Sequence, residues 1–374
     1  MDTITFPNGL ITMAGNLHLP GDFDPQGSYP AIVTVHPGGG VKEQTAGLYA
    51  AKMAEEGFVA LAYDASFQGE SGGEPHHLED PFARVEDVRA AVDFLQSLDY
   101  VDAERIGVLG VCAGGGYAVN AALTDYRIKA VTTVSAVNIG TSFRRGWFGT
   151  DSDAAAAPTL QAVAQQRTAE AQGADPAYIP YVPEQPDENT PRDLVEAHDY
   201  YLAPRAQHPN AKNKQLFAKS ISRIFAFDAF HLVEDLFTAP LLIVAGSEAG
   251  SLWMSTELHG RVRSPKKLVV VEGAPTWTST TCRSTSTTPW RKLPRFSGRT
   301  WRLTAKGTDQ PDAVLPGLWN PQWPGRSRHR HSSFRVASMI PLPRRGPSHP
   351  SLLDDREPGI ESNQFYTLCA MLQT

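Results

Sequence analysis

The stretch IGVLGVCAGGGY, residues 106–117, combines a strand, a sharp turn and a helix around one cysteine. An apolar run ends at Cys112, Gly110 and Gly114 stand two positions to either side, and residues 118–123 favour a helix. A nucleophilic side chain at the corner between strand and helix is the geometry called a nucleophile elbow. Glycine is expected at these two positions because a Cβ there would collide with neighbouring backbone. A helix that begins at the cysteine also directs free N–H groups towards it, which favours the thiolate.

Taken alone, the stretch also permits a plainer interpretation. Cysteine is among the most buried residue types, so Cys112 could be a small core residue, with glycines that merely let a strand meet a helix. The rest of the chain decides between the two interpretations.

The composition is that of an ordinary soluble globular protein. The 374 residues are 41% hydrophobic and 20% charged, enough for one large α/β domain with an insertion or for two smaller domains. No apolar run approaches the roughly 20 residues of a membrane span, and residues 1–4 lack the pattern of a signal peptide. Three cysteines far apart predict neither a disulfide framework nor a zinc site. A net charge of −6 gives no reason to expect a nucleic-acid or membrane partner, and we predict a cytoplasmic protein.

The composition changes near Ala274. Residues 1–274 contain 20 Lys and Arg against 34 Asp and Glu, whereas residues 275–374 contain 14 against 6. Five of the seven tryptophans also lie in the second part. Two different compositions are therefore joined in one chain.

Apolar runs rich in β-branched residues alternate with helical patterns before this change. After a hairpin within residues 4–18, buried strands are predicted at 31–35, 58–63, 106–111, 129–134, 240–245 and 267–271. Val85, Val88, Val92 and Leu95 have the spacing of an amphipathic helix. Strands that alternate with helices predict an α/β fold, with a mostly parallel sheet covered on both faces.

Prolines interrupt the pattern between residues 138 and 231. We predict that 138–231 is a cap-like insertion over the C-terminal edge of the sheet, with short helices such as 192–201 and 216–227. The core is then expected at 1–137 and 232–274. Residues 275–374, rich in Pro, Arg and Ser, are expected to form an atypical and largely irregular tail.

A glycine-rich loop, HPGGG at residues 36–40, follows the first buried strand. Acyl transfer places negative charge on the former carbonyl oxygen, and backbone N–H groups that receive it are each worth roughly 3 kcal/mol of barrier. Ala113 is expected to provide one donor, and Gly38 or Gly39 the other. An ordinary turn is the alternative interpretation of this loop. His36 is expected to position the loop rather than to act as a base.

These motifs resemble the α/β-hydrolase superfamily, in particular the branch similar to dienelactone hydrolases and Xaa-Pro dipeptidyl peptidases. The matching segments are HPGGG at 36–40, GESGG at 69–73, GVCAG at 110–114 and AFDAF at 226–230. The resemblance covers residues 1–274 and implies an α/β-hydrolase fold that acts on an acyl bond. GESGG also fits the pattern G-x-S-x-G, but a loop rather than a helix follows it, so Ser71 is expected to be non-catalytic.

The remaining members of a catalytic triad are harder to find. After the nucleophile, the order along the chain is an acid and then a histidine. The resemblance implies an aspartate at the position of Gly250, after the strand at 240–245, and Glu248 is the nearest carboxylate. Glu248 is therefore the candidate acid, with a solvated loop residue as the alternative. The base belongs after Ala274, yet the sequence has no histidine between His259 and His329.

We hypothesise that the reading frame shifts near Ala274. When the third base of each codon is joined to the first two of the next, Trp277 and Thr278 give Asp. Pro275 and Thr276 give His, Tyr, Asn or Asp, and one consistent translation begins His-Val-Asp-Leu-Tyr-Asp. The alternative is a genuine basic extension that binds an acidic partner. Resequencing the gene across codons 273–283 distinguishes the two, because an intact frame there would remove the hypothesis.

The sequence thus predicts a hydrolase that acts through Cys112 on a carboxylic ester, lactone or related acyl bond of a small molecule, without a metal or cofactor. The sequence is compatible with a homodimer. Because no histidine follows Ala274 at the expected place, we expect little or no activity from this chain. The alternative is a non-catalytic protein that keeps the pocket to bind a small molecule or a protein. A nucleotide-binding oxidoreductase is disfavoured, because the glycines around Cys112 do not give G-x-G-x-x-G in register.

Overall fold

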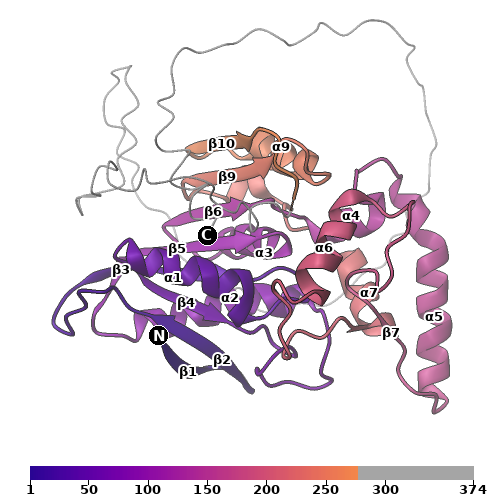
Figure 1. Cartoon of the computed structure of the whole chain (residues 1–374), viewed down its shortest axis with the longest axis horizontal. Coiled ribbons are helices and arrows are strands. Elements are labelled where there is room, and N and C mark those ends of the chain that lie inside the picture. Colours follow the sequence, from indigo (N-terminus) through magenta and orange to yellow (C-terminus); the bar gives the residue numbers. More distant parts are fainter. Residues whose placement is uncertain (277–374) are drawn as a thin grey trace, which may run out of the picture. The chain divides into compact units, whose positions relative to one another are not determined.

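The computed structural model describes residues 1–276 of the chain (Figure 1). These residues all belong to one compact unit. The tail predicted at 275–374 lies outside the described residues except for Pro275 and Thr276, and so do codons 277–283 of the proposed frame shift. Both therefore stay predictions.

Within residues 1–276, one sheet contains eight strands in the order β1-β2-β4-β3-β5-β6-β9-β10. The strands are β1 (Asp2–Asn8), β2 (Ile11–His18), β3 (Tyr29–Val35), β4 (Val59–Tyr63), β5 (Val101–Val111), β6 (Ala130–Val134), β9 (Leu241–Gly246) and β10 (Lys266–Val271). β1 and β2 form the predicted antiparallel hairpin, and β2 is antiparallel to β4. The remaining neighbours are parallel. The predicted α/β fold is confirmed, and each predicted strand is present, although β10 is only partly buried.

The helices divide into those of the core and those of the segment between β6 and β9. The core helices are α1 (Gly47–Glu55) with a preceding π-helical turn η1 (Lys42–Ala46), α2 (Pro81–Gln96), α3 (Ala113–Ala122) and α9 (Leu252–Arg261). The segment between β6 and β9 contains α4 (Ile139–Arg145), a 3-10 turn η2 (Asp153–Ala156), α5 (Ala157–Ala171), α6 (Arg192–Leu202), α7 (Phe217–Ala226) and α8 (Val233–Leu236). It also contains a small two-stranded sheet of β7 (Tyr178–Ile179) and β8 (Gln215–Leu216).

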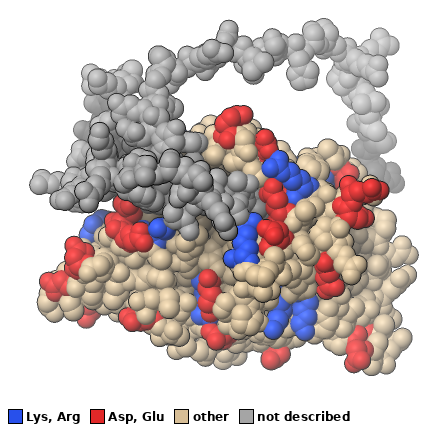
Figure 2. Space-filling view, in the orientation of Figure 1, with Lys and Arg blue, Asp and Glu red and all other residues tan. Residues whose placement is uncertain are grey.

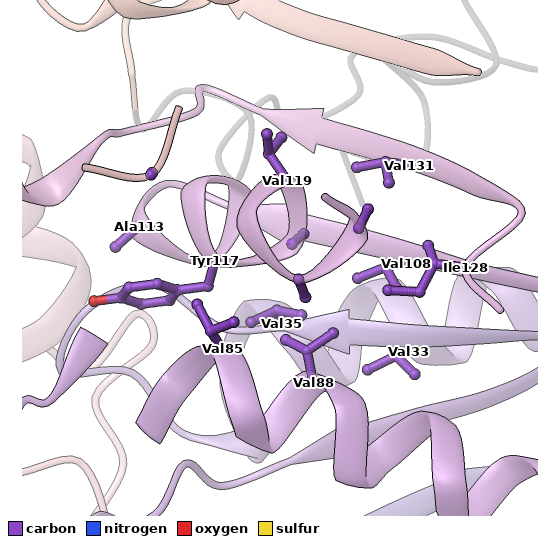
Figure 3. Close-up of a cluster of buried hydrophobic side chains, with 14 of the residues drawn as sticks. Val33, Val35, Val85, Val88, Val108, Ala113, Tyr117, Val119, Ile128 and Val131 are labelled. Atoms are coloured by element: carbon purple, nitrogen blue, oxygen red, sulfur yellow. The ribbon is translucent and has the colours of Figure 1, made fainter. Parts of the chain in front are cut away.

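Helix α2 shows why the predicted amphipathic segment folds where it does. Asp80 caps its N-terminus by accepting a hydrogen bond from the Phe82 N–H at 3.1 Å, and Pro81 occupies the first turn. Val85 and Val88 are buried and pack with α3 against the strands (Figure 3). The cap sets the start of the helix, and the apolar stripe holds it against the sheet.

Alternating side chains of the strands supply the two faces of the core. In β4, for example, Val59, Leu61 and Tyr63 pack on the face covered by α2, α3 and α9, whereas Ala60 and Ala62 face α1. This alternation is the period of two that a strand imposes. Both faces of the central strands are covered, as expected for a mainly parallel sheet.

Charges of both signs are interspersed over the face of the molecule shown in Figure 2. None of the helices in residues 1–276 combines the length and the apolar character that crossing a bilayer requires.

Candidate active site

Cys112 lies at the corner between β5 and α3, with φ 54° and ψ −122°. This conformation with positive φ is unfavourable for a residue with a side chain and persists only where the surroundings impose it. Here the Cys112 N–H donates to the Val134 carbonyl at 2.9 Å, and the Cys112 carbonyl accepts from the N–H groups of Gly115 and Val137 at 2.9 Å each. The strained corner is thus held by backbone hydrogen bonds to the adjoining helix and the neighbouring strand. As a whole residue, Cys112 is half-buried.

Gly110 and Gly114 sit where neighbouring backbone leaves no space. A Cβ at Gly110 would lie 2.2 Å from the Gly114 carbonyl oxygen, and a Cβ at Gly114 would lie 2.3 Å from the Val35 carbonyl oxygen. Both distances are far inside van der Waals contact. The predicted reason for these two glycines is confirmed.

The glycine loop after β3 approaches the start of α3. A Cβ built on Gly38 would lie 4.0 Å from the Ala113 Cβ, so the two sequence-predicted segments are neighbours. The loop turns through a hydrogen bond from the Gly40 N–H to the Pro37 carbonyl at 3.1 Å, and Gly39 has φ 70°, a conformation that suits glycine. Gly38 therefore lies beside Ala113, the residue that follows Cys112.

His36 is fully buried below this loop. Its Nε2 accepts a hydrogen bond from the Ala65 N–H at 3.1 Å, which leaves Nδ1 to donate to the Pro37 carbonyl at 2.7 Å. Burial, and next the nearby charge of Arg84, hold the pKa of His36 well below its ordinary value. A neutral ring with both nitrogens engaged positions the loop, in line with the role expected for His36.

A buried ion pair that the sequence analysis missed supports the same loop. Arg84 and Glu79 are 1% and 0% exposed, with 3.3 Å between Arg84 Nη1 and Glu79 Oε2. Arg84 Nη2 also donates to the His36 carbonyl at 2.8 Å, which ties α2 to the end of β3. Glu79 accepts from the Tyr117 hydroxyl at 2.5 Å and from the Tyr181 hydroxyl at 3.0 Å. Because each buried charge has several partners, the network is stable only as a unit. The available signal was a basic residue four positions before Val88, on the apolar face of the predicted helix.

Two tyrosines of the segment between β6 and β9 cover the glycine loop. The Tyr201 hydroxyl donates to the Gly38 carbonyl at 3.1 Å, and a Cβ on Gly39 would lie 2.7 Å from the Tyr181 ring. A pocket of only about 10 Å³ remains between Gly39, these tyrosines and residues 202 and 211–213. Both tyrosines thus contact the glycine loop.

The surroundings of Cys112 favour the neutral thiol. Burial raises its pKa to about 12, and the charges of Asp193 and Glu79 act in the same direction. A hydrogen bond from the Ala113 N–H and the charge of Arg84 oppose this rise. The Ala113 N–H is thus directed at the sulfur, but the thiolate that nucleophilic attack requires is scarce at neutral pH.

Glu248, the carboxylate nearest to the expected acid position in sequence, lies at the surface. Its side chain is 47% exposed and accepts a hydrogen bond from Arg192 at 2.5 Å. A half-exposed carboxylate in a surface ion pair is poorly placed to orient a base beside Cys112. The pairing with Arg192 could not be anticipated, because the arginine belongs to α6.

Asp193 of α6 occupies the place where an acid was expected. The residue is 3% exposed, and its Oδ2 accepts from the Gly250 N–H at 2.7 Å and from the Trp147 indole N–H at 2.5 Å. Its Oδ1 accepts from the Thr276 N–H at 3.4 Å. One carboxylate therefore contacts both the loop after β9 and the loop after β10.

None of the main groups that shift the pKa of Cys112 is a histidine. Position 276, in the loop where the base was expected, carries a threonine that is 5% exposed. The Thr276 hydroxyl finds no hydrogen-bond partner within residues 1–276.

Ser71 of the GESGG segment is buried and fully engaged. Its hydroxyl donates to the Asp64 carbonyl at 2.6 Å and accepts from the Ala14 N–H at 2.9 Å. These bonds join β2 to the loop after β4, so Ser71 has a structural role in the described residues. The expectation that it is non-catalytic agrees with this placement.

One acidic cluster in the described residues has the spacing of a metal site. Oxygen atoms of Glu43, Asp64 and Glu70 lie within 4.8 Å of one another. The Lys42 ammonium contacts all three, at 2.7, 2.9 and 2.5 Å, and is 1% exposed. The lysine already supplies the positive charge that a cation would bring, so the cluster fits an internal ion-pair network rather than a metal centre.

The sheet order, the strained corner at Cys112 and the glycine loop after β3 together define an α/β hydrolase. A model of the dienelactone hydrolase family matches residues 22–136. The chain is also 48% identical over 268 residues to the uncharacterized protein YcjY of Escherichia coli K12. The aligned region covers 71% of this chain and 87% of YcjY. This chain belongs to the dienelactone hydrolase family.

Two further similarities extend the comparison. The crystal structure of the hypothetical protein PA2218 from Pseudomonas aeruginosa superposes with a TM-score of 0.70 at 36% identity, over 74% of this chain and 87% of that one. The thiohydrolase aneE of Aspergillus aculeatus is 32% identical over 153 residues, which covers 41% of this chain and 48% of aneE. The similarities to YcjY and PA2218 cover 71% and 74% of this chain. Residues 1–274, which precede the change in composition, make up a similar share of its 374 residues.

Proposed function

We propose that this hydrolase cleaves a carboxylic ester, lactone or thioester of a small molecule through attack of Cys112 on the carbonyl carbon. The observation that carries the proposal is the strained elbow itself. Cys112 is held at φ 54° with the Ala113 N–H directed at its sulfur and the Gly38 loop beside it. Strain of this kind is maintained where a function needs it. The similarity to a thiohydrolase also supports an acyl bond as the substrate.

The proposed reaction has two steps. The Cys112 thiolate forms a bond to the carbonyl carbon, the bond to the leaving oxygen or sulfur breaks, and the leaving group takes up a proton. Water then adds to the thioester and releases the carboxylic acid, which restores the thiol. In both steps the Ala113 N–H and the N–H of Gly38 or Gly39 receive the developing oxyanion.

The same site favours slow chemistry at neutral pH. Burial raises the pKa of Cys112 to about 12, and no histidine is among the main groups that shift it. This is also the observation that favours the alternative function, a binding protein that keeps the pocket without the chemistry.

Hydrolysis of p-nitrophenyl acetate by the parent and by Cys112→Ala distinguishes the two functions. Because thiolate is the nucleophile and its pKa is about 12, the rate that depends on Cys112 should rise about tenfold per pH unit between about pH 7 and 10. Both proteins should carry Cys282→Ser and Cys369→Ser, so that any dependence on thiolate belongs to Cys112. Equal rates for parent and Cys112→Ala at every pH would exclude the enzyme and favour the binding protein.

A further inference from the structure

We propose that Asp193 is placed to orient a catalytic base in this site, and that position 276, a threonine in this chain, is where a histidine base would stand. The inference rests on the proposed function, because an orienting carboxylate matters only if Cys112 attacks an acyl group. It assigns a positioning role to a residue of the segment between β6 and β9, where the sequence analysis placed no member of the triad.

The hydrogen bonds of Asp193 join the two loops that carry acid and base in this fold. In the order nucleophile, acid, base, the acid follows the strand before the last and the base follows the last strand. Those strands are β9 and β10 here, and Asp193 contacts Gly250 after β9 at 2.7 Å and Thr276 after β10 at 3.4 Å. The carboxylate is therefore placed between the two loops, although it enters from α6.

The missing side chain of Gly250 makes this placement of Asp193 possible. A Cβ on Gly250 would lie 2.7 Å from Asp193 Oδ2 and 2.6 Å from Trp147 Nε1. An acidic side chain at position 250 would therefore compete with Asp193 for the same space. The glycine leaves room for the Asp193 carboxylate and adds a backbone donor to it, and the Trp147 indole gives a second donor to the same oxygen.

Thr276 provides an independent sign that a polar group is missing. Its hydroxyl is buried and has no hydrogen-bond partner in the described part of the chain, an arrangement that is unfavourable. Position 276 is thus buried and contacts Asp193 through its backbone, while its polar side-chain atom has no partner in the described residues. The codons for Pro275 and Thr276 are also those from which the hypothetical shifted frame reads histidine.

A histidine at position 276 would complete the chemistry. Its Nδ1–H would donate to Asp193 while the opposite nitrogen takes the proton of the Cys112 thiol. The resulting imidazolium gives that proton to the leaving group, and the neutral ring then takes a proton from the attacking water. The charge of Asp193, which raises the pKa of Cys112 in the parent, would instead stabilise the imidazolium.

The first experiment introduces a histidine at position 276 as the base. Thr276→His should hydrolyse p-nitrophenyl acetate at about pH 7 on the order of 10²-fold faster than Thr276→Gln, a control of similar size that has no base. Its rate should level off near neutral pH instead of rising tenfold per unit, because the imidazole now determines the thiolate population. Adding Asp193→Asn should remove most of the gain and lower the pKa seen in the pH profile, whereas Asp193→Glu should restore part of the gain.

A second experiment covers the case in which the buried histidine prevents folding. Thr276→Gly opens space at the same position, and added imidazole should then raise its rate with saturation. The double variant Thr276→Gly, Asp193→Asn should show a much weaker response to imidazole. Circular dichroism of each variant establishes that the compared proteins are folded.

The outcomes separate this inference from the proposed function. If neither Thr276→His nor imidazole accelerates a folded variant while the parent still exceeds Cys112→Ala, the inference is wrong and the proposed function stands. A gain that survives Asp193→Asn with an unchanged pH profile overturns the role of Asp193. A gain that survives Cys112→Ala contradicts the proposed nucleophile instead.

Discussion

Gly114→Ala is expected to destabilise the protein by more than about 3 kcal/mol, at the upper end of the cost of overpacking a core. The added Cβ would lie 2.3 Å from the Val35 carbonyl oxygen and 2.7 Å from the His36 carbonyl oxygen. Both atoms belong to backbone at the end of β3, so neither can move aside without shifting the strand or α3. Urea unfolding followed by circular dichroism measures the loss.

Gly260→Ala is the matched control for this substitution. Gly260 is an exposed residue of α9, and a Cβ there would meet nothing within 4 Å. Alanine favours a helix over glycine, so stability should rise by about 0.5–1 kcal/mol. A Gly114→Ala protein within about 1 kcal/mol of the parent would show that the elbow is not packed as described.

Arg84→Met is the second substitution with a large expected effect, a loss of about 3–5 kcal/mol. The substitution leaves the Glu79 carboxylate buried without its cation, and it removes the 2.8 Å hydrogen bond to the His36 carbonyl. The glycine loop should lose its fixed position as well, so any rate that depends on Cys112 should fall together with stability. Thermal unfolding and p-nitrophenyl acetate hydrolysis measure the two effects.

The same helix supplies the control. Arg89 pairs with Glu86 at 2.9 Å, but these side chains are 28% and 56% exposed, so Arg89→Met should cost at most about 1 kcal/mol. Combining Arg84→Met with Glu79→Gln should recover part of the loss, because the Glu79 charge is then removed together with its partner. An Arg84→Met protein as stable as Arg89→Met would refute the account of this ion pair.

Much of the core could be predicted because its signals are local. Apolar runs rich in β-branched residues mark the strands, and the spacing of Val85, Val88 and Val92 marks α2. The elbow follows from two glycines around one cysteine, since close backbone contact excludes a side chain at both positions. Each of these features depends on a short stretch of sequence.

The site beyond the elbow depends on contacts between distant segments. The packing of α6 brings Tyr201 to the glycine loop. It also brings Asp193 to the loops after β9 and β10. Nothing in the sequence near Cys112 indicates that packing. Helix α5 escaped prediction for a different reason, because Val163 is its sole buried residue and no apolar stripe results.

The acid position illustrates the same limit. Proximity in sequence favoured Glu248, which the structure places at the surface beside Arg192. The carboxylate that contacts Gly250 comes instead from Asp193, far away along the chain. Gly250, in the loop after β9, has no side chain, which was the signal that another segment fills the space beside it. The sequence did not indicate which segment that is.

The central claim, that Cys112 is an acyl-transfer nucleophile, is tested most directly by trapping the acyl-enzyme. Without a base to activate water, the thioester should break down slowly, so p-nitrophenyl acetate at about pH 9 should leave an acetyl group on the protein. Mass spectrometry of tryptic peptides should find that group on Cys112 after short exposure, and the label should be absent from Cys112→Ala. Acetylation of other residues alone, with Cys112 unmodified in the folded parent, would contradict the claim.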